Sequence, residues 1–331
     1  MPHNLRREPH VYEVKHKRKQ NPARLPWEAD MTLCLAAICV ARIPSNDYRI
    51  VFGADRRAEA SWVGGDVAFK FDWIAKGWAA LIAGDTSKSL DFLSTTRAAF
   101  EADPTPVSRN NVFDRFNDIS CAHKEKLCHR FIRQQLGISF DQFMNQSEDD
   151  LPSDLRGRLF HEMGQLEYGC ELLVFGFTKR ELHSGDTIFE PKIVEIDRYG
   201  EVFMHQNFAA IGTGAVIAKS TLYQRGQSAF TSLESTIYRI FEASHLAYKS
   251  APGVGQITQF QILEPPTVTD DTLRLKGTNQ KCLGIMASTF EAIGPKPMIA
   301  IPSLSNCFDV ILPLRPKRKA KSPKKTKAKD S

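Results

Sequence analysis

Four residues in the first third of the chain carry groups that could act together in nucleophilic chemistry. They are a hydroxyl, a carboxylate, an ammonium group and a glycine turn, at Thr32, Asp55, Lys70 and Gly84. A threonine hydroxyl is a poor nucleophile at neutral pH and needs a base to take its proton. These groups can take part in nucleophilic chemistry only if the fold brings them to one edge.

Two predicted hairpins would position these residues. Residues 32–41 form a continuous apolar run, which is typical of a strand buried on both faces, and turn residues separate it from a second strand at 48–55. Residues 69–75 and 78–83 form the next pair around a Lys76-Gly77 turn. If the strands pair antiparallel, Thr32 lies beside Asp55, and Lys70 and Gly84 lie at the same rim.

The later elements follow in the order helices, strands, helices, strand. Thr231 and Glu234 suggest a capping box at the start of one of the late helices. Strands grouped in this way predict an α+β fold of stacked antiparallel sheets with helices outside, rather than a doubly wound parallel sheet. The expected helices are 87–102, 111–135 and 154–166, then two further helices after residue 204, the second of which opens at Thr231, and a last one at 282–293. The expected strands are 171–177, 192–197, 202–204, 256–263 and 310–313.

Four short motifs carry a resemblance to a known family. Residues 53–58 read Gly-Ala-Asp-Arg-Arg-Ala, the interval from Lys70 to Gly84 has the family's length, and residues 171–177 and 208–214 have similar strings in register. Over residues 32–264 the chain resembles the β-type subunits of the proteasome and their bacterial relatives, which are N-terminal-nucleophile (Ntn) hydrolases. The resemblance implies a four-layer αββα sandwich.

The resemblance also implies a role for each residue. Thr32 would be the nucleophile, and its own free α-amine would take the proton from the hydroxyl. Lys70 would stabilise the developing negative charge, and Asp55 would keep Lys70 charged. The Gly84 N–H would donate to the oxyanion. Arg57 would brace Asp55.

The family pattern is altered at three further positions. Thr213 stands where the family has a serine, so a hydroxyl is kept. Lys249 and Pro252 align with an aspartate and a serine near the nucleophile, and after a small shift Ser250 takes the place of that serine. Thr213 and Ser250 are therefore expected to support the site from a second layer.

A free amine at Thr32 requires the removal of residues 1–31. Met31 precedes a small residue, which is the pattern that a methionine aminopeptidase cleaves. We therefore interpret this segment as a basic leader that is either a propeptide or an over-extended start.

Charge and composition exclude other classes. Residues 315–331 carry +8 and residues 1–30 carry +3, which leaves −5 of the overall +6 for the body between them. A basic tail of this kind is typically disordered and can contact acidic surfaces or nucleic acid. The chain has no apolar run of membrane-spanning length and no secretory signal, which indicates no membrane partner.

The cysteines suggest no disulfide framework and no zinc ribbon, because the seven are scattered without a C-x-x-C pair. The grouping of Cys121, His123, Cys128 and His129 does not favour a metal, because on a helix the cysteines share a face that the histidines do not. The site is expected to need no cofactor and no metal, and reduced thiols indicate the cytoplasm.

The sequence thus predicts a proteasome-like threonine peptidase acting on proteins or peptides. A homo-oligomeric ring and an ATPase regulator follow by analogy. A catalytically silent ring subunit and a non-proteolytic Ntn amidase are the alternatives. The predicted units are the leader 1–31, the hydrolase domain 32–264, an extension 265–314 of unknown role and the tail 315–331.

Overall fold

The computed structural model describes most of the body of the chain. The described residues are 32–41, 47–55, 58–60, 63–65, 70–103, 107–147, 151–182, 185, 187–257, 259–266, 273–294 and 308–311. Residues 1–31 and 312–331, which include both basic segments, lie outside this part.

Two larger antiparallel sheets and a small ribbon make up the described β structure. One sheet has six strands in the order β10-β1-β2-β11-β12-β13, the second has five in the order β5-β6-β7-β8-β9, and β3 pairs with β4. Their bounds are β1 Cys34–Val40, β2 Tyr48–Ala54, β3 Ala58–Ala60, β4 Val63–Gly65, β5 Phe71–Ala75, β6 Trp78–Gly84, β7 Cys170–Glu181, β8 Thr187–Ile196, β9 Val202–His205, β10 Phe208–Ile211, β11 Gln261–Glu264, β12 Arg274–Thr278 and β13 Phe308–Ile311.

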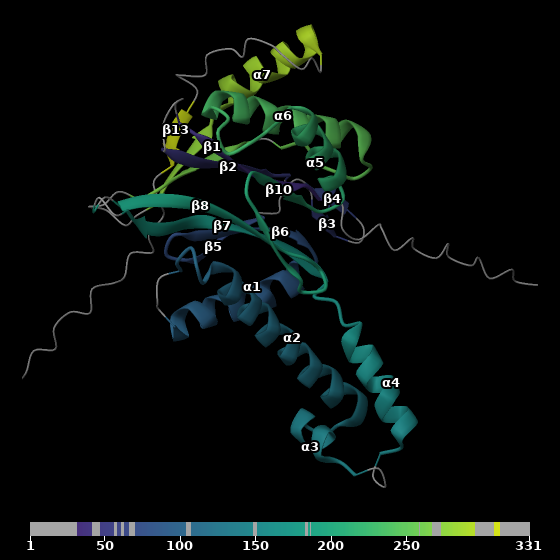
Figure 1. Cartoon of the computed structure of the whole chain (residues 1–331). Coiled ribbons are helices and arrows are strands. Elements are labelled where there is room, and N and C mark those ends of the chain that lie inside the picture. Colours follow the sequence, from purple (N-terminus) through teal and green to yellow (C-terminus); the bar gives the residue numbers. More distant parts are fainter. Residues whose placement is uncertain are drawn as a thin grey trace, which may run out of the picture.

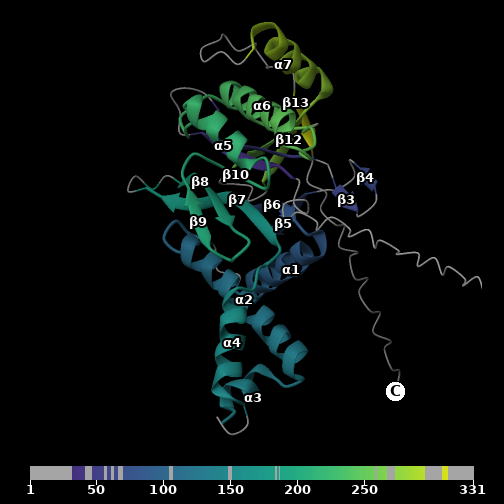
Figure 2. The same ribbon diagram turned by 90° about the vertical axis from the view of Figure 1, so that its right-hand side faces the viewer.

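Seven helices occur in the described part of the chain, outside the two sheets (Figure 1). Helices α5 and α6 cover the six-stranded sheet, with α7 packed on α6, while α1 and α2 cover the five-stranded sheet (Figures 1 and 2). Their bounds are α1 Thr86–Ala102, α2 Val112–Leu136, α3 Phe140–Asn145, α4 Ser153–Gly164, α5 Ala215–Gln224, α6 Leu233–Ser250 and α7 Gln280–Ile293. The predicted α+β class with antiparallel sheets is confirmed.

Strand β1 lies in the middle of this packing, since all seven of its residues are buried. Alternate residues face opposite sides of a strand. Leu35 and Ala37 pack with α5 and α6, whereas Ala36 and Ile38 pack toward the five-stranded sheet. The continuous apolar run therefore reflects burial on both faces, as predicted.

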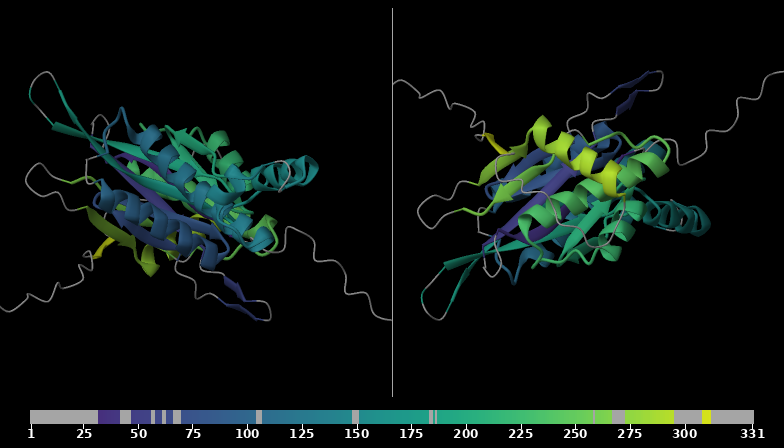
Figure 3. Two further views of the ribbon diagram at one scale, coloured as in Figure 1. Left: turned by 90° about the horizontal axis from the view of Figure 1, so that it is seen from below. Right: turned by 90° about the horizontal axis from the view of Figure 1, so that it is seen from above.

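Both predicted hairpins are present. Strand β1 pairs antiparallel with β2, with Cys34 opposite Ala54, and β5 pairs with β6, with Phe71 opposite Leu81. Viewed from above and below, the two sheets lie over each other (Figure 3). A shared core that includes Phe52, Leu81 and Phe175 fills the space between them.

Two local predictions are wrong. Helix α6 is capped by Ser232, whose hydroxyl accepts from the Ser235 N–H at 3.4 Å, and not by a Thr231–Glu234 box. The Thr231 hydroxyl instead accepts from the Ser228 N–H at 3.1 Å. The strand expected at 256–263 is confined to β11, at residues 261–264.

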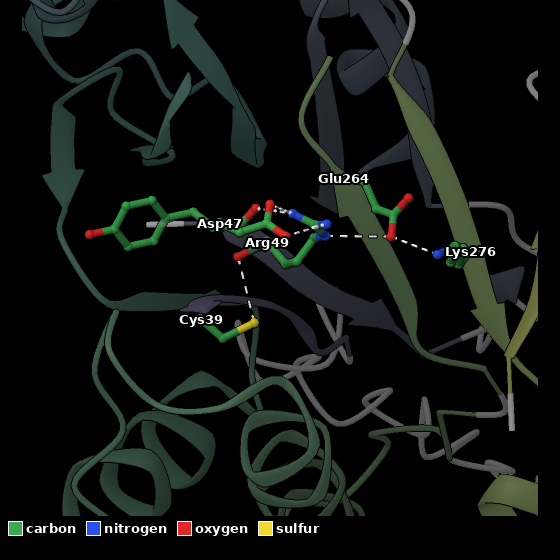
Figure 4. Close-up of polar contacts among 6 residues, drawn as sticks. Cys39, Asp47, Arg49, Glu264 and Lys276 are labelled. Carbon is green, nitrogen blue, oxygen red and sulfur yellow. Dashed lines mark hydrogen bonds and ion pairs between the residues drawn. The ribbon is translucent and has the colours of Figure 1, made fainter. Parts of the chain in front are cut away.

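The segment after residue 264 continues the six-stranded sheet. Strand β12 pairs with β11, and β13 pairs with β12. A polar cluster joins the strands at the start of β2: the Arg49 Nε lies 3.4 Å from the Glu264 carboxylate, to which Lys276 donates at 2.7 Å (Figure 4). Arg49 also donates to Asp47 at 2.9 Å.

Helices α2, α3 and α4 form an arm that extends from the body (Figures 1 and 2). Its own apolar cluster includes Ile132, Phe143, Leu159 and Met163. This cluster is separate from the cores that hold the sheets. The arm is therefore a locally packed helical unit.

Candidate active site

Thr32 lies two residues before β1 and is buried. Its main-chain carbonyl accepts a hydrogen bond from the Gly214 N–H at 3.2 Å. Gly212 packs against the same carbonyl, because a Cβ atom at Gly212 would lie only 2.4 Å from the Thr32 oxygen. The turn after β10 therefore holds the main chain of Thr32.

Asp55 follows β2 directly. Antiparallel pairing with β1 places it opposite Leu33, whose carbonyl accepts from the Asp55 N–H at 2.9 Å. The Asp55 carboxylate is fully buried, and its Oδ2 atom accepts from the Gly255 N–H at 2.8 Å. The hairpin thus brings a buried carboxylate next to the residue that precedes β1.

Lys70 connects these two groups. Its Nζ atom lies 2.6 Å from Thr32 Oγ1 and forms an ion pair with Asp55 Oδ1. Burial raises the pKa of Asp55, while Lys70 and the backbone hydrogen bonds from Gly255 and Leu33 act in the opposite direction. The ammonium group is the contact that offsets the burial of this carboxylate.

Gly84 ends β6 with φ of 100°, which favours glycine. The Ile82 N–H, two residues earlier, donates to the Lys70 carbonyl at 3.0 Å. Because N–H groups alternate in direction along a strand, the Gly84 N–H points to the side of β6 on which Lys70 lies. A donor is therefore directed toward the rim that holds Lys70.

A cavity lies between the ends of the two sheets, beside Gly84. Within it, Glu171 Oε2 accepts from the Gly212 N–H at 2.8 Å, and Glu171 Oε1 lies 3.4 Å from the Arg198 guanidinium. Burial raises the pKa of the Cys170 thiol to about 11, so this thiol is protonated at neutral pH. The lining residues are Ala83, Gly84, Glu167, Gly169, Cys170, Glu171, Arg198 and Gly212.

The other predicted residues are Arg57, Thr213 and Ser250. Arg57 falls outside the described residues. Thr213 is exposed, although it lies between the two glycines that hold Thr32. Ser250 is exposed at the end of α6, and Lys249 extends over the ring of Tyr248, 5.6 Å from its centroid.

Three residues of the arrangement were not anticipated from the sequence. Gly255 and Gly212 contribute backbone N–H groups. The residue type at a position does not reveal what its backbone N–H group binds. In the sequence, Glu171 stands out only as part of an apolar strand motif. The one available signal was its position, since a carboxylate at the start of a buried strand requires a partner.

The described residues contain no group of three or more His, Cys, Asp or Glu side chains placed to hold a metal ion. His123 is buried and stacks on Phe92, with ring centroids 4.5 Å apart, and His129 stacks on Phe140. Both histidines thus pack against aromatic rings. Among the described helices, none is long and apolar enough to cross a bilayer.

No protein-family model matches the chain. No curated protein matches its sequence either. The functional interpretation therefore depends on the geometry of the site and on the motif resemblance.

The arrangement of Thr32, Lys70 and Asp55 suits nucleophilic chemistry. An ammonium group 2.6 Å from a hydroxyl oxygen stabilises negative charge on that oxygen. The ammonium cannot take the hydroxyl proton while it is itself protonated, so a separate base is required. A free α-amine on Thr32 would be such a base.

Proposed function

We propose that the chain is a threonine-type hydrolase of amide bonds, with the four-layer αββα architecture of Ntn hydrolases and Thr32 as its nucleophile. The observation that carries the proposal is the Lys70 ammonium group, which contacts both the Thr32 hydroxyl and the buried Asp55 carboxylate. The order helices, sheet, sheet, helices supports the architecture.

The reaction proceeds in two stages. Thr32 Oγ1 attacks the carbonyl carbon while its proton passes to the free α-amine of the same residue. The tetrahedral oxyanion accepts a hydrogen bond from Gly84 N–H, and the C–N bond breaks as the proton is delivered to the leaving amine. Water then hydrolyses the ester on Thr32, which releases the acid and restores the hydroxyl.

Covalent labelling tests this proposal. In a chain that begins at Thr32, a threonine-directed epoxyketone or β-lactone is expected to add once per chain, at Thr32, as measured by intact mass and peptide mapping. The Thr32→Ala variant and the full chain, in which the Thr32 nitrogen is bonded to Met31, should remain unmodified. Equal labelling of Thr32→Ala, or no labelling of the folded chain that begins at Thr32, would contradict the proposal.

A catalytically silent subunit is the second candidate. It is favoured by the end of α6, where Ser250 is exposed and no described hydrogen bond links it to Thr32. A silent subunit predicts a folded chain that no threonine-directed reagent modifies. Proteolysis rather than small-amide hydrolysis, the homo-oligomeric ring and the ATPase regulator remain predictions, which degradation of an unfolded protein and measurement of particle mass would check.

A further inference from the structure

Glu171 links the two sheets beside the candidate nucleophile. It is the second residue of β7, in the five-stranded sheet, yet its Oε2 atom accepts from the N–H of Gly212, which follows β10 of the six-stranded sheet. Arg198 lies 3.4 Å from the other carboxylate oxygen. One oxygen of the Glu171 carboxylate therefore lies near Arg198, and the other accepts a hydrogen bond from the turn after β10.

This turn is the segment that contacts the main chain of Thr32. Strand β10 ends at Ile211, opposite Cys34 of β1, so the following N–H groups lie beyond the β1–β10 ladder. Gly212 has φ of 85° and lies so close to the Thr32 carbonyl that only a residue without a Cβ atom fits. Gly214 then donates its N–H to that carbonyl at 3.2 Å.

We propose that Glu171 is a positioning residue for Thr32, acting through the Gly212–Gly214 turn. A hydrogen bond from an N–H group to an ionised carboxylate is stronger than one to a neutral acceptor. The hydrogen bond between the Gly212 N–H and the Glu171 carboxylate positions the turn. The turn positions the Thr32 carbonyl, and the position of the carbonyl sets the direction of the Thr32 side chain. Glu171 itself touches no reacting atom.

The catalytic part of this inference rests on the proposed function. The distance between Thr32 Oγ1 and Lys70 Nζ is 2.6 Å, so a small rotation of the Thr32 main chain would remove the contact. A misplacement of 1 Å in an active site can lower a rate by roughly 100-fold. Loss of the carboxylate should therefore lower the rate of the chemical step rather than weaken substrate binding.

The test compares Glu171→Ala, Glu171→Gln and the control Glu167→Ala, each in a chain that begins at Thr32. Glu167 lines the same cavity and is exposed, so its removal alters the charge of the cavity without touching the turn. Deuterium exchange of the segment 208–216 measures the turn independently of activity. The rate of epoxyketone labelling and the separate values of kcat and KM measure the chemistry.

In Glu171→Ala we expect the Gly212 amide to exchange at least about tenfold faster, since local opening becomes easier, with the β1 amides unchanged. Labelling and kcat should fall by roughly 10- to 100-fold with KM nearly constant. Glu171→Gln keeps an oxygen that accepts from Gly212, so it should stay within about threefold of the parent chain. Glu167→Ala should leave the exchange of the Gly212 amide unchanged.

Unchanged exchange at Gly212 in Glu171→Ala would overturn the inference, and so would faster exchange with an unchanged labelling rate. If Glu171→Ala does not fold, Glu171→Asp replaces it, because its carboxylate is one methylene shorter and cannot reach Gly212 equally well. If the parent chain is not labelled at all, the proposed function fails, while exchange at Gly212 still decides whether Glu171 holds the turn.

Discussion

Lys70 is the residue on which the candidate site depends most. Its ammonium group is within hydrogen-bonding distance of the Thr32 hydroxyl and is paired with a carboxylate that has no exposed surface. The pair therefore contributes to stability as well as to chemistry. A buried pair of this kind costs little as long as both partners are present.

Removal of Lys70 should affect both properties. In Lys70→Ala, Asp55 loses its cation and remains buried, so we expect the free energy of unfolding at neutral pH to fall by about 3–5 kcal/mol. Threonine-directed labelling should fall by at least about 100-fold, because charge on the Thr32 oxygen is no longer stabilised. Urea denaturation and labelling kinetics measure the two effects.

The matched control is Lys76→Ala, in the exposed turn of the same hairpin. It removes the same side chain and should change stability by less than about 0.5 kcal/mol. The loss in the free energy of unfolding of Lys70→Ala should also be smaller at low pH, where Asp55 takes up a proton and no longer needs a cation. Labelling of Lys70→Ala at the parent rate would show that the ammonium group has no part in the chemistry.

At the scale of single residues, side chains were easier to anticipate than backbone donors. Thr32 and Asp55 could be placed together because an apolar run and a turn define a hairpin, and hairpin pairing fixes which residues lie opposite. Gly255 lies 200 positions from the carboxylate that it donates to. No local pattern specifies such a contact, because it depends on how α6 returns the chain to the sheet.

At the scale of elements, α2 packs on the five-stranded sheet through a titratable side chain. His123 is buried between Phe92 and Tyr168, with ring centroids 4.5 Å and 4.9 Å away. Burial lowers the pKa of His123 to about 4, from an ordinary value of 6.5. The histidine is thus neutral in the folded chain over most of the range in which an unfolded chain would protonate it.

Stability should consequently fall as the pH is lowered from about 6.5 toward about 4. In this window the unfolded chain binds a proton at His123 and the folded chain does not, which lowers the free energy of unfolding by up to about 1.4 kcal/mol per pH unit. In His123→Phe, the difference in stability between pH 7 and pH 5 should decrease by about 1–2 kcal/mol. Urea titrations at both pH values measure it.

His129→Phe is the control, because His129 is largely exposed and stacks on Phe140 in the arm. Its pH dependence should match that of the parent chain. If His123→Phe retained the full pH dependence, the neutral state of His123 would not be the cause.

Helices and strands could be predicted where the sequence signal is local. The predictions were wrong where the structure depends on long-range contacts. Both hairpins and helices α1, α2 and α4 could be predicted, since apolar periodicity reports the buried face directly. The cap of α6 was placed one residue early because Thr231 and Ser232 have similar capping ability, and the Ser228 turn engages Thr231. The strand expected at 256–263 begins only at Gln261, and just before this segment Gly255 donates to Asp55.

At the scale of the whole molecule, the segment after residue 264 is part of the main core. Leu273 and Leu275 pack in the core between the sheets, while Cys282 and Met286 of α7 pack in the core beneath α6. Strand β12 also covers the edge of β11. No role for this segment could be predicted from the sequence, because its strands acquire a partner only in the folded sheet.

Deletion of residues 265–331 should therefore destabilise the chain. Four apolar side chains that are buried in the described part of this segment are lost, and β11 becomes an exposed edge that promotes association. We expect the midpoint of thermal unfolding to fall by at least roughly 10 °C, or the chain to aggregate. Calorimetry and size-exclusion chromatography distinguish these results.

Deletion of residues 315–331 alone is the matched control, because it retains every described element and should leave the unfolding midpoint unchanged. A chain truncated after Glu264 that unfolds at the parent temperature as a monomer would show that β12 and α7 add nothing to stability.

The contacts of Gly212 and Gly214 with the Thr32 carbonyl have a consequence for how activity would begin. In the 331-residue chain the Thr32 nitrogen belongs to the peptide bond with Met31, yet the contacts to its carbonyl and hydroxyl are already formed. Under the proposed function, the uncut chain is a latent precursor in a finished conformation. Cleavage of the Met31–Thr32 peptide bond supplies the free α-amine that accepts the proton. Activity then begins without refolding, and the time of cleavage alone decides when it begins.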